Sequence, residues 1–319
     1  MKLINRVANR IESNVVAKFR INKKSIRGEK IFDIADSQEL ISDLIESKSP
    51  FLVARFGTTE SRILLDDFNG SFDKESILNL WKLSGVFPPT IEIADRFAKL
   101  LIDTSREIDV CGVRSAWFER LFWRQEMTIL GKLQIKPKLI NIEALSPIGV
   151  SSSWVSSLRG LNVLVIHPFA DSIESQYSRR QELFADSEWL PEFKIKTLKS
   201  VQSLSGNESE VGFKDWFQAL EQMKTDISKV DFDLALVGAG AYGMFLGAHI
   251  KNLGKQAIHV GGALQLFFGI KGSRWTDPLT PEFIKDSERS SWVWPSATET
   301  PETFNEVENG AYWDNRSLN

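Results

Sequence analysis

Short apolar runs alternate along the chain with longer stretches in which apolar residues recur every three or four positions. Bounded apolar runs predict buried strands, and a period near 3.6 residues predicts amphipathic helices. Strands are expected at residues 50–56, 108–113, 138–143, 162–168, 193–198, 232–238 and 256–262. Helices are expected at 74–84, 90–105, 115–131, 174–186, 212–228 and 241–253, after one whose start is marked by Asp36 and Glu39 in capping-box spacing.

This alternation of strands and helices predicts an α/β fold: a doubly wound, mainly parallel, Rossmann-like sheet with helices on both faces. We assign it to residues 31–275 as one domain. A basic amphipathic helix is expected over residues 1–30, and an acidic, Trp-containing C-terminal tail over 276–319.

The two ends differ in charge. Residues 1–30 carry nine Lys or Arg and two Glu, and apolar residues recur every four positions, at Leu3, Val7, Ile11, Val15 and Phe19. Such a helix either lies on an anionic membrane surface or packs on the domain with its basic side in water. The acidic tail is either loose or folds back on the domain through Trp292 and Trp294.

Composition narrows the classes of function. The net charge of −3 gives no indication of nucleic-acid binding, and no apolar run reaches 18 residues. The single cysteine, Cys111, excludes a disulfide framework, and its place in an apolar run predicts a core residue. Without a secretory signal, we expect a cytoplasmic protein. The ten Trp and 21 Phe indicate either a large core or stacking surfaces for ligands.

Candidate chemistry gathers where the predicted strands end. In doubly wound sheets, ligands bind beyond the carboxyl ends of the strands. Arginines, carboxylates, a histidine and two glycine turns follow these ends, at Arg55, Glu60, Arg114, Glu143, His167, Asp171, 238–243, Gly261 and Gly262. We therefore expect a ligand site along this edge.

The segment "LVGAGAYG" contains a Gly-x-Gly-x-x-Gly pattern, formed by Gly238, Gly240 and Gly243. Glycines there bring backbone amides to a phosphate at a helix amino end, so we expect Gly238, Gly240 and Tyr242 to bind a diphosphate. An NAD-binding unit also needs an acidic residue at the end of the next strand, where this chain has His259 and Gly261. The pattern thus disfavours an NAD-dependent oxidoreductase, and a tight turn without ligand remains an alternative.

The segment "FLVARFGTTESRI" places Arg55, Gly57 and Glu60 at the end of the first strand. It resembles the signature turn of GT-D-type glycosyltransferases, in which Arg-Phe-Gly precedes an Asp-x-Glu pair that serves the nucleotide sugar and its metal. "LVGAGAYGMFLGAHIKNLGKQAIHVGG" resembles the closing unit of that family. The chain departs from the pattern at Thr58, which stands where the family has Asp.

One carboxylate and a Thr hydroxyl hold Mn²⁺ or Mg²⁺ poorly. Three alternatives follow: an Arg or Lys replaces the metal, a carboxylate comes from Asp66, Asp67 or Glu143, or the fold has lost the transferase chemistry. For the first alternative we expect Arg179, on a helical face shared with Gln176.

Two further segments complete the expected site. In residues 162–182, Ser172, Gln176 and Arg179 are expected to bind the nucleotide sugar, His167 either to contact substrate or to stay buried, and Asp171 and Glu174 to cap a helix. After the last strand, Gly261, Gly262, Gln265 and Arg274 are expected to contact the nucleotide sugar. His249 and His259 are interpreted as structural.

The resemblance implies a glycosyltransferase that moves a sugar from a nucleoside-diphosphate donor to a glycan or lipid-linked acceptor in surface polysaccharide assembly. Arg55, Glu60 and His167 would be its catalytic residues, Gly57 and Thr58 would contact the donor, and the basic helix would suit the inner face of the membrane. The alternative is a non-catalytic scaffold protein that retains the nucleotide-sugar pocket.

Overall fold

The computed structural model describes residues 25–26, 28–114, 120–150, 152–204, 207, 211–278 and 283–316. The expected basic helix at residues 1–30 therefore falls almost entirely outside the described residues. Within these ranges, no helix is both long and apolar enough to cross a membrane.

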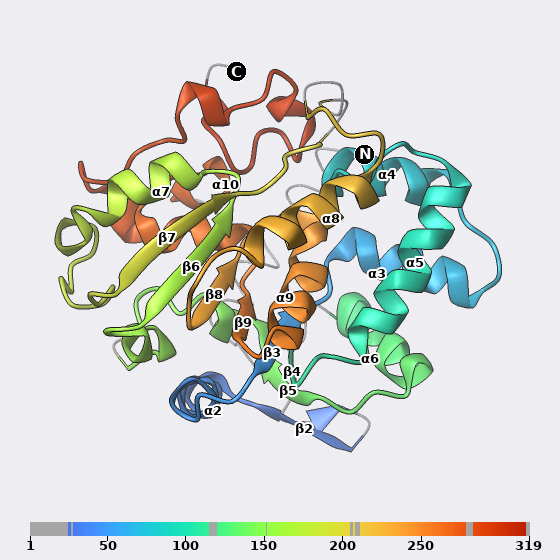
Figure 1. The fold of residues 1–319 in the computed structure, drawn as a ribbon, viewed down its shortest axis with the longest axis horizontal. Coiled ribbons are helices and arrows are strands. Elements are labelled where there is room, and N and C mark those ends of the chain that lie inside the picture. Colours follow the sequence, from blue (N-terminus) through green and yellow to red (C-terminus); the bar gives the residue numbers. More distant parts are fainter. Residues whose placement is uncertain are drawn as a thin grey trace.

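Eight parallel strands form the central sheet, in the order β2-β5-β4-β3-β9-β8-β6-β7, and the short antiparallel β1 extends it beyond β2 (Figure 1). The strands are β1 Ser25–Ile26, β2 Glu29–Phe32, β3 Phe51–Arg55, β4 Val110–Val113, β5 Lys138–Asn141, β6 Asn162–His167, β7 Lys194–Lys199, β8 Leu234–Val237 and β9 Gln256–His259. The seven strands expected from apolar runs, β3 to β9, are confirmed within a few residues. The pattern of apolar runs missed β1 and β2, because both strands are short and Ile31 is the one fully buried residue of β2.

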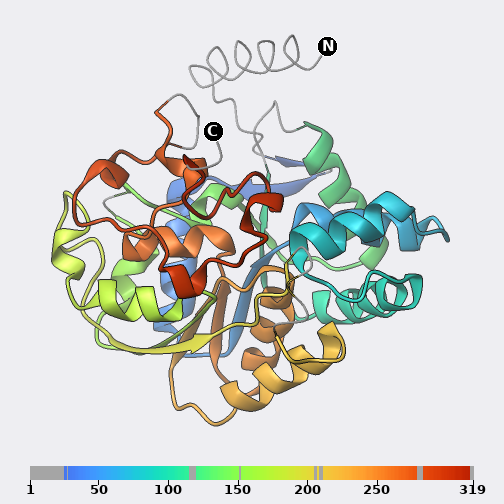
Figure 2. The same cartoon turned by 90° about the horizontal axis from the view of Figure 1, so that it is seen from above.

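Helices cover both faces of this sheet (Figures 1 and 2). One face carries α3 (Thr58–Phe68), α4 (Lys74–Ser84), α5 (Ile91–Ser105), α6 (Arg120–Leu133), α8 (Trp216–Ile227) and α9 (Gly243–Asn252). The other carries α2 (Ile34–Glu46), α7 (Ala170–Tyr177) and the short helices η3 (Trp154–Leu158), η7 (Gly262–Phe268) and α10 (Ser273–Thr276). The expected doubly wound Rossmann-like fold is confirmed.

Each face has its own hydrophobic core because successive strand residues point to opposite sides. On β3, Leu52 and Ala54 join the first core, whereas Phe51 and Val53 join the second. The large aromatic residues fill these cores, and Trp154, Trp216 and Trp313 are among the largest fully buried side chains. Cys111 is buried in β4 as expected, and burial raises the pKa of its thiol.

Three helices differ from the expectation. Helix α2 begins after Asp33, whose side chain accepts the Asp36 amide, so Asp36 is not the cap. Helix α3 follows β3 directly and was not expected as a helix. Helix α7 begins after Phe169, without a side-chain cap, so Asp171 and Glu174 do not form the expected capping box.

Helix α7 also ends earlier than expected. Its last residue, Tyr177, is fixed at the start of β7: the Tyr177 hydroxyl donates to the Phe193 carbonyl at 2.8 Å and accepts from the Phe193 amide at 2.6 Å. This anchor ends the helix there, and Leu183 and Phe184 enter the second core from the turns that follow.

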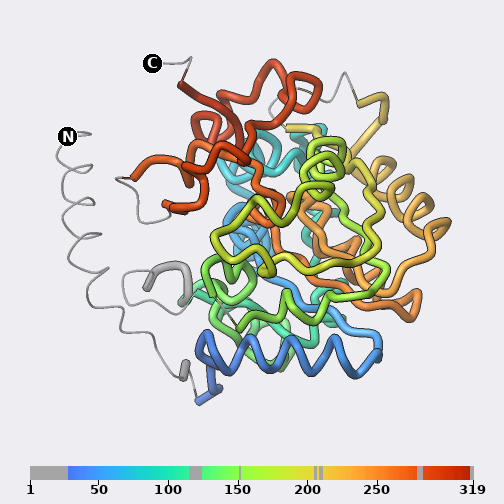
Figure 3. Tube along the Cα trace, turned by 90° about the vertical axis from the view of Figure 1, so that its left-hand side faces the viewer, coloured from blue at the N-terminus to red at the C-terminus, as the bar shows by residue number. Residues whose placement is uncertain are grey.

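The C-terminal segment, residues 283–316, packs on the domain. Trp292 and Trp313 are 2% and 1% exposed and belong to the second core, and Trp294 is half-buried. The segment lies at the end of the molecule opposite α2 (Figure 3). Its Trp313 packs edge-on against Phe169, just beyond the carboxyl end of β6. It therefore lies beside the edge where the site is expected.

Candidate functional site

The centre of the sheet has the geometry of a switch point between β3 and β9. The two strands pair in parallel, yet the segment after β3 (α3) packs on the first face and the segment after β9 (η7) on the second. Neighbouring strands whose following segments diverge leave a crevice at their carboxyl ends, and ligands of such folds bind there. Arg55 ends β3 on one side, and Gly261 and Gly262 follow β9 on the other.

Arg55 lies across the backbone of Gly261. A Cβ atom on Gly261 would overlap the Arg55 guanidinium, and Gly261 has a φ of +82°, which L side chains rarely adopt. Within the described residues, the guanidinium makes no hydrogen bond or ion pair. Among the residues described, this half-buried cation at the switch point has no anionic partner.

The turn after β3 holds Glu60 in place. Gly57 precedes α3, and the Glu60 carboxylate folds back so far that a Cβ on Gly57 would overlap it. Thr59 donates to Glu60 Oε2 at 2.9 Å and also shares a short hydrogen bond with Ser84, the last residue of α4. Gly57 and Glu60 therefore lie together, as expected, and Ser84 is a neighbour that the sequence did not indicate.

Thr58, at the start of α3, is bonded to Arg114. The Arg114 Nη2 donates to Thr58 Oγ1 at 3.3 Å, and its Nη1 lies 2.6 Å from Oε1 of Glu126. Glu126 is 1% exposed and also accepts the Arg114 amide at 2.9 Å, which fixes this arginine after β4. The cation beside Thr58 is thus Arg114.

These residues do not fit a divalent cation. The turn supplies one carboxylate, Glu60, which bonds Thr59, and a guanidinium bonds the Thr58 hydroxyl. Divalent cations of the magnesium class need several oxygen ligands, and a neighbouring guanidinium repels them. No group of three or more His, Cys, Asp or Glu suited to a metal occurs among the residues that the structure describes.

The other carboxylates considered for a metal lie elsewhere. Asp66 is at the far end of α3, about 12 Å from Thr58 along the helix axis, and pairs with Arg62 at 3.3 Å. Asp67, the next residue, has its pKa raised by burial and by the neighbouring Asp95. Glu143 is exposed after β5, two strands away from β3. This geometry does not favour the alternative in which one of them completes a metal site.

The glycine turn after β8 meets the same neighbours. Gly240 is exposed and has a φ of +52°, and a Cβ atom added there would have the Ser84 carbonyl oxygen as its nearest neighbour, at 4.0 Å. Since Ser84 also bonds Thr59, the Gly240 turn and the Glu60 turn border one another. The other two glycines serve packing: Gly238 faces the His167 ring, and Gly243 faces the ring of His259.

Tyr242 is buried rather than turned to a ligand. Its ring stacks on Trp216 at 4.7 Å, and its hydroxyl lies 3.1 Å from that of Ser203. This interaction holds the glycine turn against α8. The expected direct contact between Tyr242 and a nucleotide sugar is not supported by this geometry.

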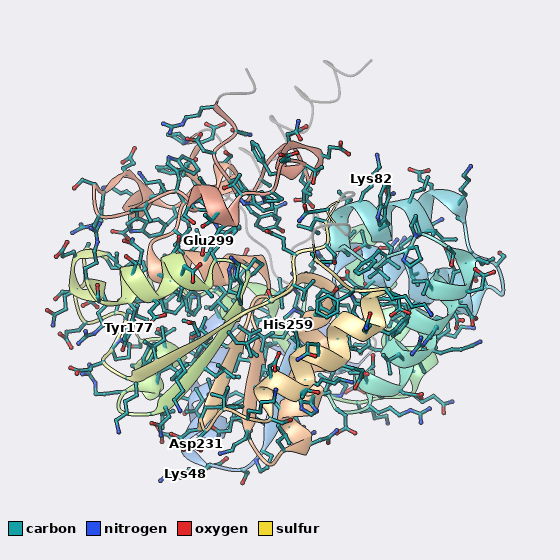
Figure 4. The ribbon with its side chains drawn as sticks, turned by 45° about the horizontal axis from the view of Figure 1, so that its top comes forward. Lys48, Lys82, Tyr177, Asp231, His259 and Glu299 are labelled. Carbon is teal, nitrogen blue, oxygen red and sulfur yellow. The ribbon has the colours of Figure 1, made fainter. Side chains whose placement is uncertain are left out.

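Two buried histidines flank the turn, and neither is suited to proton transfer. His167 Nδ1 accepts the Phe169 amide at 3.0 Å, and burial lowers its pKa to about 3. Burial and the Arg55 cation together lower the pKa of His259 to about 3. His259 lies at the centre of the molecule (Figure 4), and its ring nitrogens have no hydrogen-bond partner within the described residues. The expectation of a catalytic His167 gives way to its alternative, a buried histidine.

Ser172, Gln176 and Arg179 do not join this cluster. Ser172 donates through its amide to the buried Glu299 at 3.1 Å, Gln176 donates to the Ser291 carbonyl at 2.9 Å, and Arg179 donates to the same carbonyl at 2.6 Å. All three hold the C-terminal segment, from which Glu299 projects (Figure 4).

Arg179 also lies at the wrong end of the sheet to replace a metal beside Arg55. The next residue, Arg180, pairs at 3.0 Å with Glu192, which precedes β7 at its amino end. The expectation that Arg179 stands beside Arg55 is therefore wrong, because α7 runs back towards the amino ends of the strands.

Gln265 and Arg274 likewise contact the C-terminal segment. Gln265 is fully buried and donates to the carbonyls of Lys271 at 2.9 Å and Tyr312 at 3.2 Å. Arg274 forms an ion pair with Glu308. Gly262, by contrast, remains at the switch point, half-exposed, with the Tyr312 ring against it.

The structure thus brings together one part of the expected site: Arg55, Gly57, Thr58, Glu60, Gly240, Gly261 and Gly262. It adds Ser84, Arg114 and Tyr312. Only Arg114 had a sequence signal, its place after a strand; the other two come from segments whose packing the sequence did not reveal. A cavity of about 310 Å³ lies away from this cluster, between α6 and the amino end of β5.

Replacing Gly238 with alanine is expected to lower the free energy of unfolding by about 2–3 kcal/mol. The new Cβ would lie 2.6 Å from the His167 ring and 2.9 Å from the Gly261 carbonyl. Thermal unfolding measures the effect, and Gly254→Ala is the matched control. Gly254 has a φ of +78° and open space around it, so its replacement adds strain without overlap, about 1 kcal/mol. Equal losses in the two variants would contradict the packing account.

The comparison with a known protein family agrees with this architecture. A family model, GT-D-like, described as a GT-D fold-like domain, matches residues 33–267. A solved structure described as the highly conserved domain of unknown function 1792, with a distinct glycosyltransferase fold, is 18% identical, with a TM-score of 0.43 over 78% of this chain and 82% of that chain. A selenomethionine-substituted structure of domain of unknown function 1792 is 17% identical, with a TM-score of 0.42 over 79% and 82%. No curated protein matches the chain.

Proposed function

The chain belongs to the GT-D-like family, and from this premise we propose that it transfers a sugar from a nucleoside-diphosphate donor to a glycan or lipid-linked acceptor. The observation that carries the proposal is the half-buried Arg55 guanidinium, which has no polar partner within the described residues and lies on Gly261 at the switch point. A diphosphate is the ligand that such a cation, beside a glycine turn, recognises best.

The proposed chemistry is electrostatic. When the bond between sugar and phosphate breaks, negative charge develops on the departing diphosphate. Arg55 would neutralise that charge, and the backbone amides of the turn at Gly240, which leads into α9, would donate to the phosphate oxygens. Both groups are already in place, so little reorganisation is needed during the reaction.

Glu60 is the carboxylate of this cluster. Glu60 either positions the donor by binding the hydroxyls of the donor, or accepts the proton of the acceptor hydroxyl. Its hydrogen bond with Thr59 and its close approach to Gly57 fix the carboxylate in one orientation, which suits both roles.

We propose that no divalent cation is required. Arg114, bonded to Thr58, and Arg55 would carry the positive charge of the site. Transfer is therefore expected to be unchanged, within about twofold, after removal of metal with EDTA and after addition of Mn²⁺ or Mg²⁺. The measurement is the rate of nucleoside diphosphate release at fixed donor and acceptor. A rate that falls in EDTA and returns with Mn²⁺ would show that a cation takes part.

A second candidate function is a non-catalytic scaffold that binds a nucleotide sugar. Thr58 favours this function, because a threonine in place of the family's Asp leaves the turn with a single carboxylate, Glu60. Calorimetric titration of UDP-, GDP- and CMP-sugars, followed by an assay for hydrolysis and transfer, separates the two functions. Binding with turnover supports the transferase, and binding without turnover in any acceptor mixture supports the scaffold.

The setting in surface polysaccharide assembly, at the cytoplasmic face of the membrane, is part of the proposal. The polysaccharide part follows from the family resemblance alone. The membrane part is supported by the basic composition of residues 1–30, nine Lys or Arg against two Glu, which favours contact with anionic lipid. Binding of the full chain to vesicles with and without anionic lipid tests this part separately.

A further inference from the structure

An aromatic side chain from the C-terminal segment lies at the switch point. The Tyr312 ring packs so closely on Gly262 that a Cβ there would overlap it. Gly262 follows Gly261, on which the Arg55 guanidinium lies. The Cα atoms of consecutive residues are about 3.8 Å apart, so Tyr312 and Arg55 rest on adjacent residues of one turn. The C-terminal segment also lies outside the family match, which ends at residue 267.

The backbone around Tyr312 is firmly held. The Arg274 amide donates to the Ala311 carbonyl at 3.1 Å, and Gln265 donates to that of Tyr312 at 3.2 Å. The Ser273 amide donates to the Trp313 carbonyl at 3.1 Å. Three successive carbonyls of the segment are thus bonded to the region after β9, which fixes the position of the tyrosine.

The hydroxyl of Tyr312 is available to a ligand. The side chain is half-buried. Its hydroxyl makes no hydrogen bond within the described residues, and the oxygen is not fully buried. The hydroxyl therefore reaches solvent. The Arg274 guanidinium lies 5.2 Å from the ring centre and is paired with Glu308, a 42% exposed side chain.

This combination suits a sugar ring. The C–H face of a sugar packs against an aromatic ring, and its hydroxyls both donate and accept, so an arginine–carboxylate pair can serve them together. The group joined directly to the terminal phosphate of a nucleotide sugar is the sugar itself. It would therefore occupy the space beside the phosphate-binding Arg55.

We propose that Tyr312, with the Arg274–Glu308 pair, binds the sugar of the donor, and that residues outside the family domain thereby set sugar specificity. This inference rests on the proposed function, because it takes Arg55 as the diphosphate-binding residue.

The test compares each nucleoside diphosphate with its sugar adduct. UDP, GDP, UDP-glucose and GDP-mannose are titrated calorimetrically into the full chain and its variants. For the pair that the wild type binds, Tyr312→Leu is expected to weaken the nucleotide sugar about tenfold, with the nucleoside diphosphate changed less than about twofold. Tyr312→Phe keeps the ring and is expected to retain most of the affinity. Phe304→Leu, which removes a half-buried aromatic of the same segment that packs on Trp313, is the matched control with both affinities unchanged.

A second variant guards against misfolding. Glu308→Gln changes an exposed side chain outside both cores and should also weaken the sugar adduct selectively. Equal losses for the diphosphate and its adduct, or no loss in Tyr312→Leu and Glu308→Gln, would overturn the inference while leaving the proposed function intact. If the wild type bound none of the four ligands, the proposed function would fail and the inference with it.

Discussion

Replacement of Arg55 with alanine is expected to lower the rate of sugar transfer by about 100- to 1000-fold, which is the usual cost of losing one group that stabilises developing charge. The free energy of unfolding should change by no more than about 1 kcal/mol, because the guanidinium has no polar partner within the described residues. A large loss of rate with little loss of stability indicates a charged side chain that binds a ligand rather than stabilises the fold.

The measurement combines initial rates with thermal unfolding. Arg159→Ala is the matched control, because Arg159 is 57% exposed and pairs with Glu188, away from the switch point. That variant makes the same change in net charge and should keep full activity. Arg55→Lys should recover part of the rate, since it restores the charge without the planar donor array. If Arg55→Ala retained full activity, the diphosphate would have to bind elsewhere.

Lowering the pH from 7 to 5 is expected to remove about 4 kcal/mol from the free energy of unfolding through two histidines. In the folded state, the pKa of both His167 and His259 is lowered to about 3. In the unfolded chain each titrates near 6.5, so below that pH the unfolded state binds protons that the folded state does not. This stability is therefore complete above about pH 6.5 and is lost as the pH falls towards about 3. Each histidine contributes about 1.4 kcal/mol per pH unit.

Denaturant unfolding at about pH 7 and about pH 5 tests this dependence. His259→Leu should halve the loss, because it removes one titrating group whose ring nitrogens have no hydrogen-bond partner within the described residues. His167→Leu should also reduce the acid loss, but it should lower stability at neutral pH, because it leaves the Phe169 amide unbonded. If His259→Leu lost as much unfolding free energy on acidification as the wild type, His259 would have to be already protonated in the folded protein at the lower pH.

The candidate site was predictable where local sequence and strand ends coincide. Arg55, Gly57, Thr58 and Glu60 belong to one turn, and the parallel sheet brings Gly240 and Gly261 to the same edge. The residues expected around 162–182, together with Gln265, were misplaced for one common reason. Ser172, Gln176, Arg179 and Gln265 are polar and lie near strand ends, but each bonds to the C-terminal segment.

The sequence by itself determined the seven strands β3 to β9, most of the helices between them and the glycine turns, because strand and helix periods and turn residues act over short stretches of chain. Only the tertiary structure decided which polar groups remain open to a ligand. Both Arg55 and Arg179 were expected from the sequence to serve the nucleotide sugar, yet Arg179 bonds to Ser291 and Arg55 has no polar partner within the described residues. The partner of a side chain depends on contacts between residues far apart in the chain, such as the 112 positions that separate Arg179 from Ser291, and such contacts leave no local pattern.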